Sequence, residues 1–268
     1  MTSPALPEPA LLFCPADRPD RYQKAVSSAD VVVLDLEDAV SADRKAGARE
    51  ALISVPVDPA RVIVRVNAAG TSEHAADVAA LASTLYQRVM LPKAETAAQL
   101  TALGRRQVVA LCETPLGVLN AAQIAAAPNV IALMWGAEDL IAAMGGRTSR
   151  FADGAYRAVA MHARSTVLLA AKAHGRVAID AVCTDIRDLD RLAAEAEDAA
   201  ASGFSLKACI HPSQVPVVRT AFRADEAQVA WAKRVIAAAR DGGVVAVDGQ
   251  MIDTPLIRQA EAILASPS

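Results

Sequence analysis

Residues 31–40 read VVVLDLEDAV, a run of apolar residues that ends in the acids Asp35, Glu37 and Asp38. The β-branched run does not alternate with polar residues, which is typical of a strand buried on both faces within a parallel sheet. Parallel barrels build their active sites at the carboxyl ends of such strands. The stretch therefore predicts a buried parallel strand that delivers acidic side chains to a site.

Seven more short apolar runs share this pattern, and helical patterns lie between them. Strict alternation of strands and helices implies right-handed crossovers and a parallel sheet. Eight units in about 225 residues match a closed (β/α)8 barrel, so we expect an α/β TIM barrel over residues 1–222. An open doubly wound sheet is the alternative, but CPADRPDR lacks its glycine-rich turn. The other runs cover residues 11–14, 62–66, 88–92, 108–112, 130–135, 177–182 and 207–211.

Two kinds of local signal complete the outline of the fold. Ser41, and Thr114 followed by Pro115, are suited to begin helices. After the barrel, residues 223–268 add two helical patterns that flank VVAVDGQMID. A barrel does not require this tail, so we expect a separate C-terminal helical segment.

Composition excludes several classes of function. The formal net charge is −3, and Lys and Arg are scattered among Asp and Glu without the basic stripe that nucleic acid requires. The N-terminus lacks the basic region of a signal peptide, and acids interrupt the most apolar stretch, so we expect no membrane association. The four cysteines are far apart with no CxxC pair, which favours reduced thiols and the cytoplasm.

Charged and polar residues follow most of the predicted strands. A strand that emerges into solvent often ends in a charged residue, which is the simpler explanation for any one of them. Together they predict converging carboxylates, whose repulsion a cation would relieve. Oxygen-only ligands favour Mg²⁺, which usually takes one or two protein carboxylates, and the histidines show no zinc spacing. The residues are Asp35, Glu37 and Asp38; Arg65 and Asn67; Lys93; Glu113; Glu138 and Asp139; Asp180; and His211.

Eight blocks resemble, in order, those of the citrate lyase β-subunit and malyl-CoA lyase family, the HpcH/HpaI aldolase/citrate lyase family. The resemblance implies a (β/α)8 barrel that binds Mg²⁺ and cleaves or forms the carbon–carbon bond of a β-hydroxyacyl-CoA thioester. It extends over nearly the whole chain. The blocks are FCPADRPDRYQKA, VVVLDLEDAV, VRVNAAGT, MLPKAE, ALCETPLGVLNA, MWGAEDLIAAMGG, CIHPSQV and DGQMIDTPLIRQA.

The resemblance also implies roles for particular residues. Glu113 and Asp139 match the metal-ligating carboxylates, and Arg65 matches the arginine that binds substrate near the metal. Fixed positive charge there would meet the oxyanion that develops in retro-Claisen cleavage. The amides of Gly136, Ala137 and Glu138 could hold the carboxylate of the keto acid, although an ordinary strand-to-helix turn explains them equally well.

Asp253 matches a catalytic acid/base that a neighbouring subunit delivers, which implies a homo-oligomer, a trimer or a dimer of trimers. Its alternative role is to cap the last helix. Arg21 and Lys24 match basic positions that contact CoA phosphates, or they are solvated helix charges. Relatives commonly have a lysine where this chain has Gln250, which places a local charge contact in doubt.

Three further residues are expected to support the site. Glu37 and Asp38 would hydrogen-bond metal-bound water or orient Arg65. Lys93 would act similarly, or it is only a loop cation after Pro92. The partners we expect are an acyl-CoA thioester and a small α-keto acid.

The leading interpretation is a stand-alone Mg²⁺-dependent β-hydroxyacyl-CoA lyase, with the acyl group and the direction open and a following thioesterase step conceivable. The alternative is the β-subunit of a citrate lyase complex, which acts on a thioester of an acyl carrier protein. A barrel that only binds acyl-CoA would be free to lose Arg65, Glu113, Asp139 and Asp253, and their presence argues against it. A metal aldolase of free hydroxy-keto acids would not need Arg21 and Lys24.

Overall fold

The computed structural model describes residue 6 and residues 9–240, 245–247 and 249–265. The chain forms two compact units, residues 1–218 and residues 219–268. The first unit holds the predicted strands, and the second holds the C-terminal helices.

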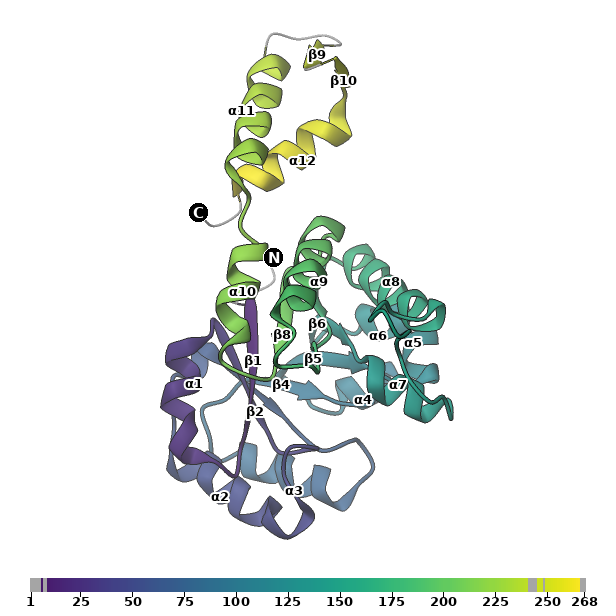
Figure 1. The fold of residues 1–268 in the computed structure, drawn as a ribbon. Coiled ribbons are helices and arrows are strands. Elements are labelled where there is room, and N and C mark those ends of the chain that lie inside the picture. The colour runs from purple at the N-terminus through teal and green to yellow at the C-terminus, as the bar shows by residue number, and fades with distance from the viewer. Residues whose placement is uncertain (1–5, 7–8, 241–244, 248, 266–268) are drawn as a thin grey trace. The chain divides into compact units, whose positions relative to one another are not determined.

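The first unit is a closed barrel of eight parallel strands that follow one another in chain order, with helices outside the ring of strands (Figure 1). This confirms the predicted (β/α)8 barrel and all eight predicted strands. The strands are β1 (Ala10–Pro15), β2 (Val31–Asp35), β3 (Val62–Arg65), β4 (Arg88–Leu91), β5 (Gln107–Cys112), β6 (Val130–Trp135), β7 (Val177–Asp180) and β8 (Leu206–Cys209).

Alternate residues of these strands fill the barrel interior with one hydrophobic cluster. Val31 and Val33 of β2, with Val109 and Leu111 of β5, belong to it. Because side chains of a strand alternate between faces, the next residue of the same face in β2 is Asp35, and the next after β5 is Glu113. The apolar interior therefore ends in a polar layer at the carboxyl end of the barrel.

The helices mostly follow the predicted patterns. Thr114 caps α5 by accepting a hydrogen bond from the amide of Gly117, as expected. Ser41 does not cap a helix through its side chain, because its hydroxyl donates to Asp43 instead. The helices are α1 (Tyr22–Ser28), α2 (Lys45–Ser54), α3 (Ser72–Leu81), α4 (Ala97–Thr101), α5 (Pro115–Leu119), α6 (Ala121–Ala126), α7 (Ala137–Ala143), α8 (Ala158–Ala173), α9 (Leu189–Ser202) and α10 (Gln214–Ala221), with short 3-10 turns at Pro19–Arg21, Ala42–Arg44 and Pro59–Arg61.

The second unit is a helical hairpin with a small antiparallel β-ribbon. Helices α11 (Glu226–Arg240) and α12 (Thr254–Ala265) pack together, and strands β9 (Val245–Val247) and β10 (Gln250–Ile252) pair between them in sequence. Ala232, Val235, Ile252 and Ala260 form its buried centre. The predicted helices of the tail are confirmed.

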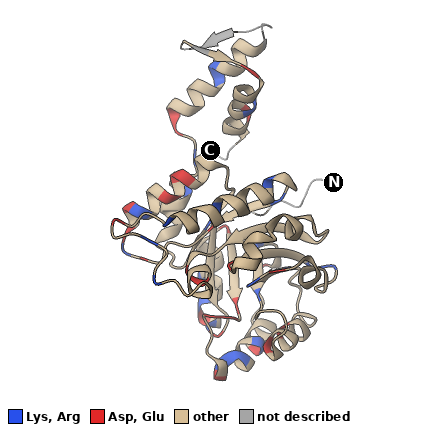
Figure 2. Ribbon diagram, turned by 90° about the vertical axis from the view of Figure 1, so that its right-hand side faces the viewer, with Lys and Arg blue, Asp and Glu red and all other residues tan. Residues whose placement is uncertain are grey.

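The charge distribution, the length of the apolar helices and the state of the cysteines bear on possible partners and surroundings. Lys and Arg positions are interspersed with Asp and Glu positions along the ribbon (Figure 2). No helix in the described part of the chain combines the length and the apolar character that a bilayer crossing demands. The four cysteines are buried free thiols, in agreement with the predicted lack of disulfides.

Candidate active site

Arg65 and Asp35 form the firmest contact at the carboxyl end of the barrel. They are partners in register on the adjacent strands β2 and β3, and both face the interior. The guanidinium donates two parallel hydrogen bonds to the carboxylate, Nε to Oδ1 at 2.7 Å and Nη2 to Oδ2 at 2.5 Å. Asp35 also accepts from the amides of Glu37 and Ala39. This fork fixes the plane of the guanidinium at the floor of a cavity.

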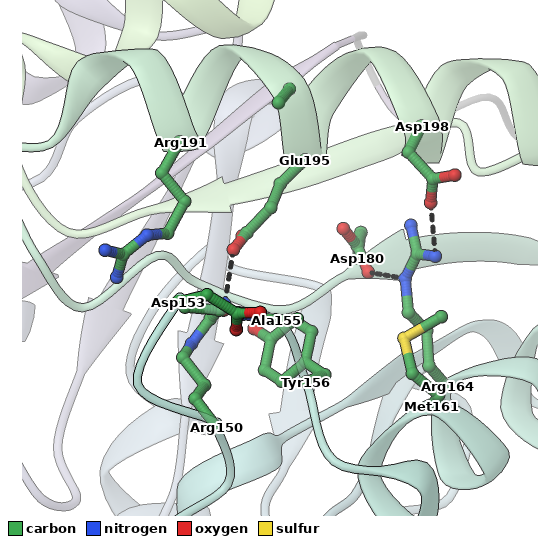
Figure 3. Close-up of a pocket in the computed structure, with 12 residues that line it drawn as sticks. Arg150, Asp153, Ala155, Tyr156, Met161, Arg164, Asp180, Arg191, Glu195 and Asp198 are labelled. Carbon is green, nitrogen blue, oxygen red and sulfur yellow. Dashed lines mark hydrogen bonds and ion pairs between the residues drawn. The ribbon is translucent and has the colours of Figure 1, made fainter.

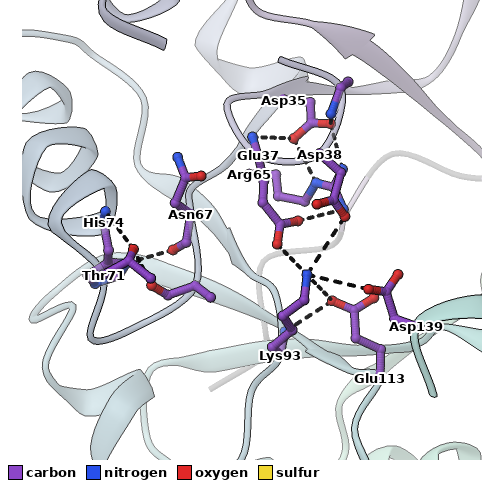
Figure 4. A network of polar contacts seen from close by, with 12 residues as sticks. Asp35, Glu37, Asp38, Arg65, Asn67, Thr71, His74, Lys93, Glu113 and Asp139 are labelled. Atoms are coloured by element: carbon purple, nitrogen blue, oxygen red, sulfur yellow. Dashed lines mark hydrogen bonds and ion pairs between the residues drawn. The ribbon is translucent and has the colours of Figure 1, made fainter. Parts of the chain in front are cut away.

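Glu37 and Lys93 link this pair to the next connections along the barrel (Figure 4). Glu37 Oε2 lies 3.0 Å from Arg65 Nη1, and Glu37 Oε1 accepts a 2.5 Å hydrogen bond from Lys93 Nζ. Burial raises the pKa of Glu37, although Arg65 and Lys93 oppose this. Asp38 is more exposed and lies 3.8 Å from Arg65 Nη1. Of the two acids predicted to support Arg65, Glu37 lies closer to the guanidinium than Asp38 does.

Glu113 and Asp139 meet near the same lysine. Asp139 Oδ1 lies 3.4 Å and Glu113 Oε1 lies 4.0 Å from Lys93 Nζ. Glu113 is only 3% exposed. Burial, and then the negative charge of Asp139, raise the pKa of Glu113 to about 8. The two carboxylates predicted to bind metal are thus brought together from the ends of β5 and β6.

Gly136 makes this approach possible. A Cβ atom added at this position would lie 2.8 Å from Glu113 Oε2 and 3.0 Å from Glu113 Cβ, so any larger residue would displace the carboxylate. Gly136 also precedes α7, whose first amides have no acceptor within the helix. The carboxylate of Glu138 accepts a 2.7 Å hydrogen bond from Ser149, so only its backbone amide is available for the predicted role.

These side chains surround a cavity of about 440 Å³. Charged side chains line the cavity near the ends of β2, β3 and β5. The wall at β1 is apolar, and the ring centroid of Phe13 there lies 5.1 Å from the Arg65 guanidinium. The lining includes Phe13, Asp35, Asp38, Arg65, Leu111, Glu113, Met134, Trp135, the segment 136–139, Ala181, Val182, Thr184 and Ile210.

The donors at this cavity suit a hard divalent cation. Among the described residues no three His, Cys, Asp or Glu side chains are grouped as a metal cage. Mg²⁺ does not need one, because it usually binds one or two carboxylates and keeps other positions for water and substrate. Glu113 is 3% exposed, and burial and then the negative charge of Asp139 raise its pKa, so a bound cation would stabilise the charged form of this carboxylate. Glu113 and Asp139 are therefore suited to bind Mg²⁺.

Three residues that were expected at the site lie elsewhere. Asp180 faces the outside of the barrel, because Ile179 before it packs in the interior cluster. Asn67 is buried against Lys45 and Asp77 beneath the connection after β3. His211 is exposed and bonds to Ser213. The rule that strand ends carry the site was too broad, since only alternate residues point into the barrel.

Asp180 instead organises a second polar cluster between α8 and α9 (Figure 3). It binds Arg164 at 2.9 Å and Lys207 at 3.0 Å, and it accepts a 2.7 Å hydrogen bond from the indole of Trp135. Arg150 joins the cluster through Glu195 at 2.6 Å. A cavity of about 320 Å³ adjoins these residues.

The remaining predicted residues are Arg21 and Lys24 of the first unit and Asp253 and Gln250 of the second unit. Arg21 and Lys24 are exposed at the start of the first helix, and neither is among the described residues that line the cavity. Asp253 belongs to the second unit, where its carboxylate accepts from the amide of Leu256 at 3.4 Å at the start of α12. It thus occupies the capping position given as its alternative role. The side chain of Gln250 lies outside the described residues.

The sequence placed Asp35 among the strand-end acids without a role as the partner of Arg65, and Phe13 is the lining residue that it did not indicate. The signal for Asp35 was present, since its alternation with Val31 and Val33 places it on the interior face. A buried arginine on the neighbouring strand also requires a carboxylate partner. Phe13 has the same alternation with Leu11, but an aromatic residue in an apolar run does not by itself indicate a site.

Comparison with known proteins agrees with this geometry. The chain is 57% identical to the citrate lyase subunit beta-like protein of Mycobacterium tuberculosis over 96% of this chain and 94% of that protein. It is 34% identical to a (3S)-malyl-CoA thioesterase of Cereibacter sphaeroides over 99% and 96% of the two chains.

A crystal structure of the protein CitE from M. tuberculosis, in complex with magnesium, acetoacetate and coenzyme A, superposes with a TM-score of 0.94 at 56% identity. It covers 96% of this chain and 97% of that one. The sequence profile of the HpcH/HpaI aldolase/citrate lyase family matches residues 10–212, which include every barrel strand. The chain belongs to the HpcH/HpaI aldolase/citrate lyase family.

Proposed function

We propose that this protein is a Mg²⁺-dependent lyase that divides a β-hydroxyacyl-CoA thioester into an acyl-CoA and an α-keto acid. The observation that carries the proposal is the meeting of Glu113, Asp139 and Arg65 at one cavity. Two oxygen ligands and a fixed guanidinium together suit a ligand with carboxylate and carbonyl oxygens. The bound magnesium, acetoacetate and coenzyme A of the CitE structure support the same chemistry for this chain.

Cleavage breaks the bond between the hydroxyl-bearing carbon and the carbon next to the thioester. The hydroxyl loses its proton and its carbon becomes the keto carbon, while the electron pair of the broken bond passes to the thioester as an enolate. Glu113 and Asp139 would hold Mg²⁺, which supplies positive charge for developing oxyanions. Arg65, fixed by Asp35 and paired with Glu37 through Nη1, lines the same cavity. The first amides of α7 would bind the keto-acid carboxylate.

Asp253, as the acid/base, would take up the proton that the hydroxyl loses and donate it to the enolate, which becomes the acyl-CoA. Asp253 lies in the second unit, where it is exposed at the start of a helix. A neighbouring subunit would bring this carboxylic acid to the barrel, so the barrel itself would not need to supply one for this step. The proposal therefore includes a homo-oligomer, a trimer or a dimer of trimers. Residues 1–222 would form the barrel, and residues 223–268 would pack on the neighbour.

Arg21 and Lys24 would contact the CoA phosphates. Both are exposed cations on the connection that follows β1, so neither is committed to the barrel core. The reduced thiols favour the cytoplasm as the location of the enzyme.

The decisive experiment is release of keto acid from a panel of β-hydroxyacyl-CoA esters by the purified protein with Mg²⁺. We expect turnover of at least one ester, loss of turnover with a chelator, and loss of both turnover and Mg²⁺ binding in Glu113→Ala. The matched control is Glu95→Ala: Glu95 follows β4 but bonds to Thr114 outside the cavity lining. A panel without any turnover, or a fully active Glu113→Ala, would overturn the proposal.

The same panel separates this function from the citrate lyase β-subunit. Turnover of free CoA esters by the single chain supports the stand-alone lyase. Turnover of only a citryl thioester of an acyl carrier protein would assign the chain to a citrate lyase complex. Hydrolysis of the CoA ester without a keto acid would indicate a thioesterase, the activity named for the C. sphaeroides relative.

A further inference from the structure

Lys93 places an ammonium group inside the acidic cluster. Its Nζ lies 2.5 Å from Glu37, 3.4 Å from Asp139, 3.7 Å from Asp38 and 4.0 Å from Glu113 (Figure 4). These four carboxylates come from the connections after β2, β5 and β6, and Lys93 itself follows β4. One cation thus neutralises acids from three other strands.

The backbone of Lys93 is held in an unfavourable conformation. Its φ is +51°, and it is the one non-glycine residue in the described part of the chain with a positive φ. This left-handed region is costly for a residue with a Cβ. The same conformation directs the Lys93 amide toward Glu113 Oε1 at 3.1 Å. The backbone positions Glu113, while the side chain neutralises it.

A divalent cation at Glu113 and Asp139 would compete with this ammonium. Mg²⁺ binds oxygen at about 2.1 Å, whereas the ammonium lies 3.4 Å and 4.0 Å from the two carboxylates. Two cations that share these oxygens repel each other strongly in a partly buried site. The Lys93 side chain is one-third exposed, and its shortest contact is to Glu37. The ammonium can therefore move away from Glu113 and Asp139 while it stays paired with Glu37.

Resting on the proposed Mg²⁺ site, we propose that Lys93 is the resident counter-ion of the acidic cluster and that the metal binds by displacing its ammonium from Glu113 and Asp139. Lys93 therefore lowers the affinity for Mg²⁺ and stabilises the metal-free protein. Removal of the charge has two opposite effects: tighter metal binding and a less stable metal-free state.

The test is Lys93→Met, which keeps the backbone amide that binds Glu113 and removes the charge. Mg²⁺ affinity is measured by isothermal titration calorimetry, and thermal unfolding is measured with a chelator and with saturating Mg²⁺. We expect the Kd for Mg²⁺ to fall by about tenfold or more, the change that a coupling of about 1.4 kcal/mol produces. We also expect a lower Tm in chelator and a larger rise in Tm on adding Mg²⁺ than in the parent.

Two variants act as controls. Lys45→Met removes a nearby lysine whose ammonium binds Leu36 O, Glu37 O and Asn67 Oδ1, none of them a carboxylate of the proposed metal site. It should leave the Kd for Mg²⁺ within about twofold of the parent value, since solvent and salt screen a charge that contacts neither Glu113 nor Asp139. Lys93→Gln repeats the measurement with a different neutral side chain should Lys93→Met not fold.

The inference fails if both neutral variants bind Mg²⁺ no more tightly than the parent, because the ammonium would then not compete with the metal. Equal tightening in Lys45→Met would reduce the effect to net charge and also overturn it. A parent protein that binds no Mg²⁺ by calorimetry would instead refute the proposed function. The two failures are therefore distinguishable.

Discussion

The indole nitrogen of Trp135 donates a 2.7 Å hydrogen bond to Oδ1 of Asp180. Trp135 ends β6 and Asp180 ends β7, and both side chains are almost fully buried. Tyr156 meets the face of Trp135 edge-on, with ring centroids 5.2 Å apart. Since Gly136 follows Trp135 directly and Asp139 lies in the next helical turn, this contact helps to fix the end of β6 at the cavity.

Asp180→Asn should destabilise the fold, because Asp180 compensates two cations in the protein interior. Lys207 is fully buried and Arg164 is 7% exposed, so loss of the carboxylate leaves both with reduced compensation. Loss of one partner of a buried ion pair costs about 3–5 kcal/mol. Chemical denaturation at neutral pH measures it. Asp198→Asn is the control: the Asp198 side chain pairs with Arg164 but is 61% exposed, so its loss should cost about 1 kcal/mol or less.

The stability difference between the parent and Asp180→Asn should depend on pH. Burial raises the pKa of Asp180, but Lys207, Arg164 and Trp135 together bring it below its ordinary value. The folded-state pKa is then lower than the unfolded-state value of about 3.9, so the carboxylate stabilises the fold fully above about pH 4. This contribution is lost as the pH falls through the folded-state pKa. Unfolding curves of the two proteins should converge in acid, and a constant gap would refute the assignment.

The barrel could be predicted because its information is local. Eight unbroken apolar runs and the helical patterns between them give the order, the parallel pairing and the strand ends without any long-range contact. To predict whether each strand-end side chain points into or out of the barrel required one further step. Counting alternate residues from Val33 or Leu111 would have directed Asp35 and Glu113 inward, and counting from Ile179 would have directed Asp180 outward.

Other features depend on tertiary contacts that no short pattern encodes. The left-handed backbone of Lys93 and the closeness of Gly136 to Glu113 arise only when neighbouring strand ends meet. Asn67 follows a strand as a site residue would, but its side-chain oxygen accepts a hydrogen bond from Lys45, which lies 22 positions away in the sequence. Structural polar residues such as Asn67 are of the same types as active-site residues. Their burial and their hydrogen-bond partners distinguish the two groups.

Asp35→Asn should reduce catalysis through Arg65. The variant removes the charge of the fork and replaces one acceptor oxygen with an amide, so the guanidinium loses its fixed plane. Loss of such a supporting partner lowers activity by about 10–100-fold. We expect kcat/KM for the cleaved ester to fall by that factor while Mg²⁺ affinity stays near that of the parent. Asp38→Asn, whose carboxylate lies 3.8 Å from Arg65, should change kcat/KM far less; equal losses would refute the special role of Asp35.

Gly136→Ala should weaken metal binding with little loss of the fold elsewhere. The new methyl group would lie 2.8 Å from Glu113 Oε2, so the carboxylate must move. Misplacement of a ligand by its surroundings typically costs about 10–100-fold in metal affinity. Calorimetry with Mg²⁺ measures it. Gly47→Ala in α2 is the matched control, because its Cβ meets nothing within 4 Å; it should bind Mg²⁺ normally and gain about 0.5–1 kcal/mol of stability. Normal Mg²⁺ affinity in Gly136→Ala would show that Glu113 is not a ligand.

Two inactive variants should restore each other if Asp253 serves a neighbouring barrel. Asp253→Asn should fold normally, since asparagine also caps helices, and should lose enolate protonation by about 10²–10⁴-fold. Glu113→Ala retains Asp253 but lacks a carboxylate of the proposed metal site. Unfolding and refolding an equal mixture together would give sites that combine one intact barrel with one intact tail. Independent assortment makes about a quarter of all sites complete in a closed oligomer. Recovered keto-acid release near that fraction supports delivery between subunits. If the mixture stays inactive although mass spectrometry shows mixed oligomers, Asp253 acts within its own chain or not at all.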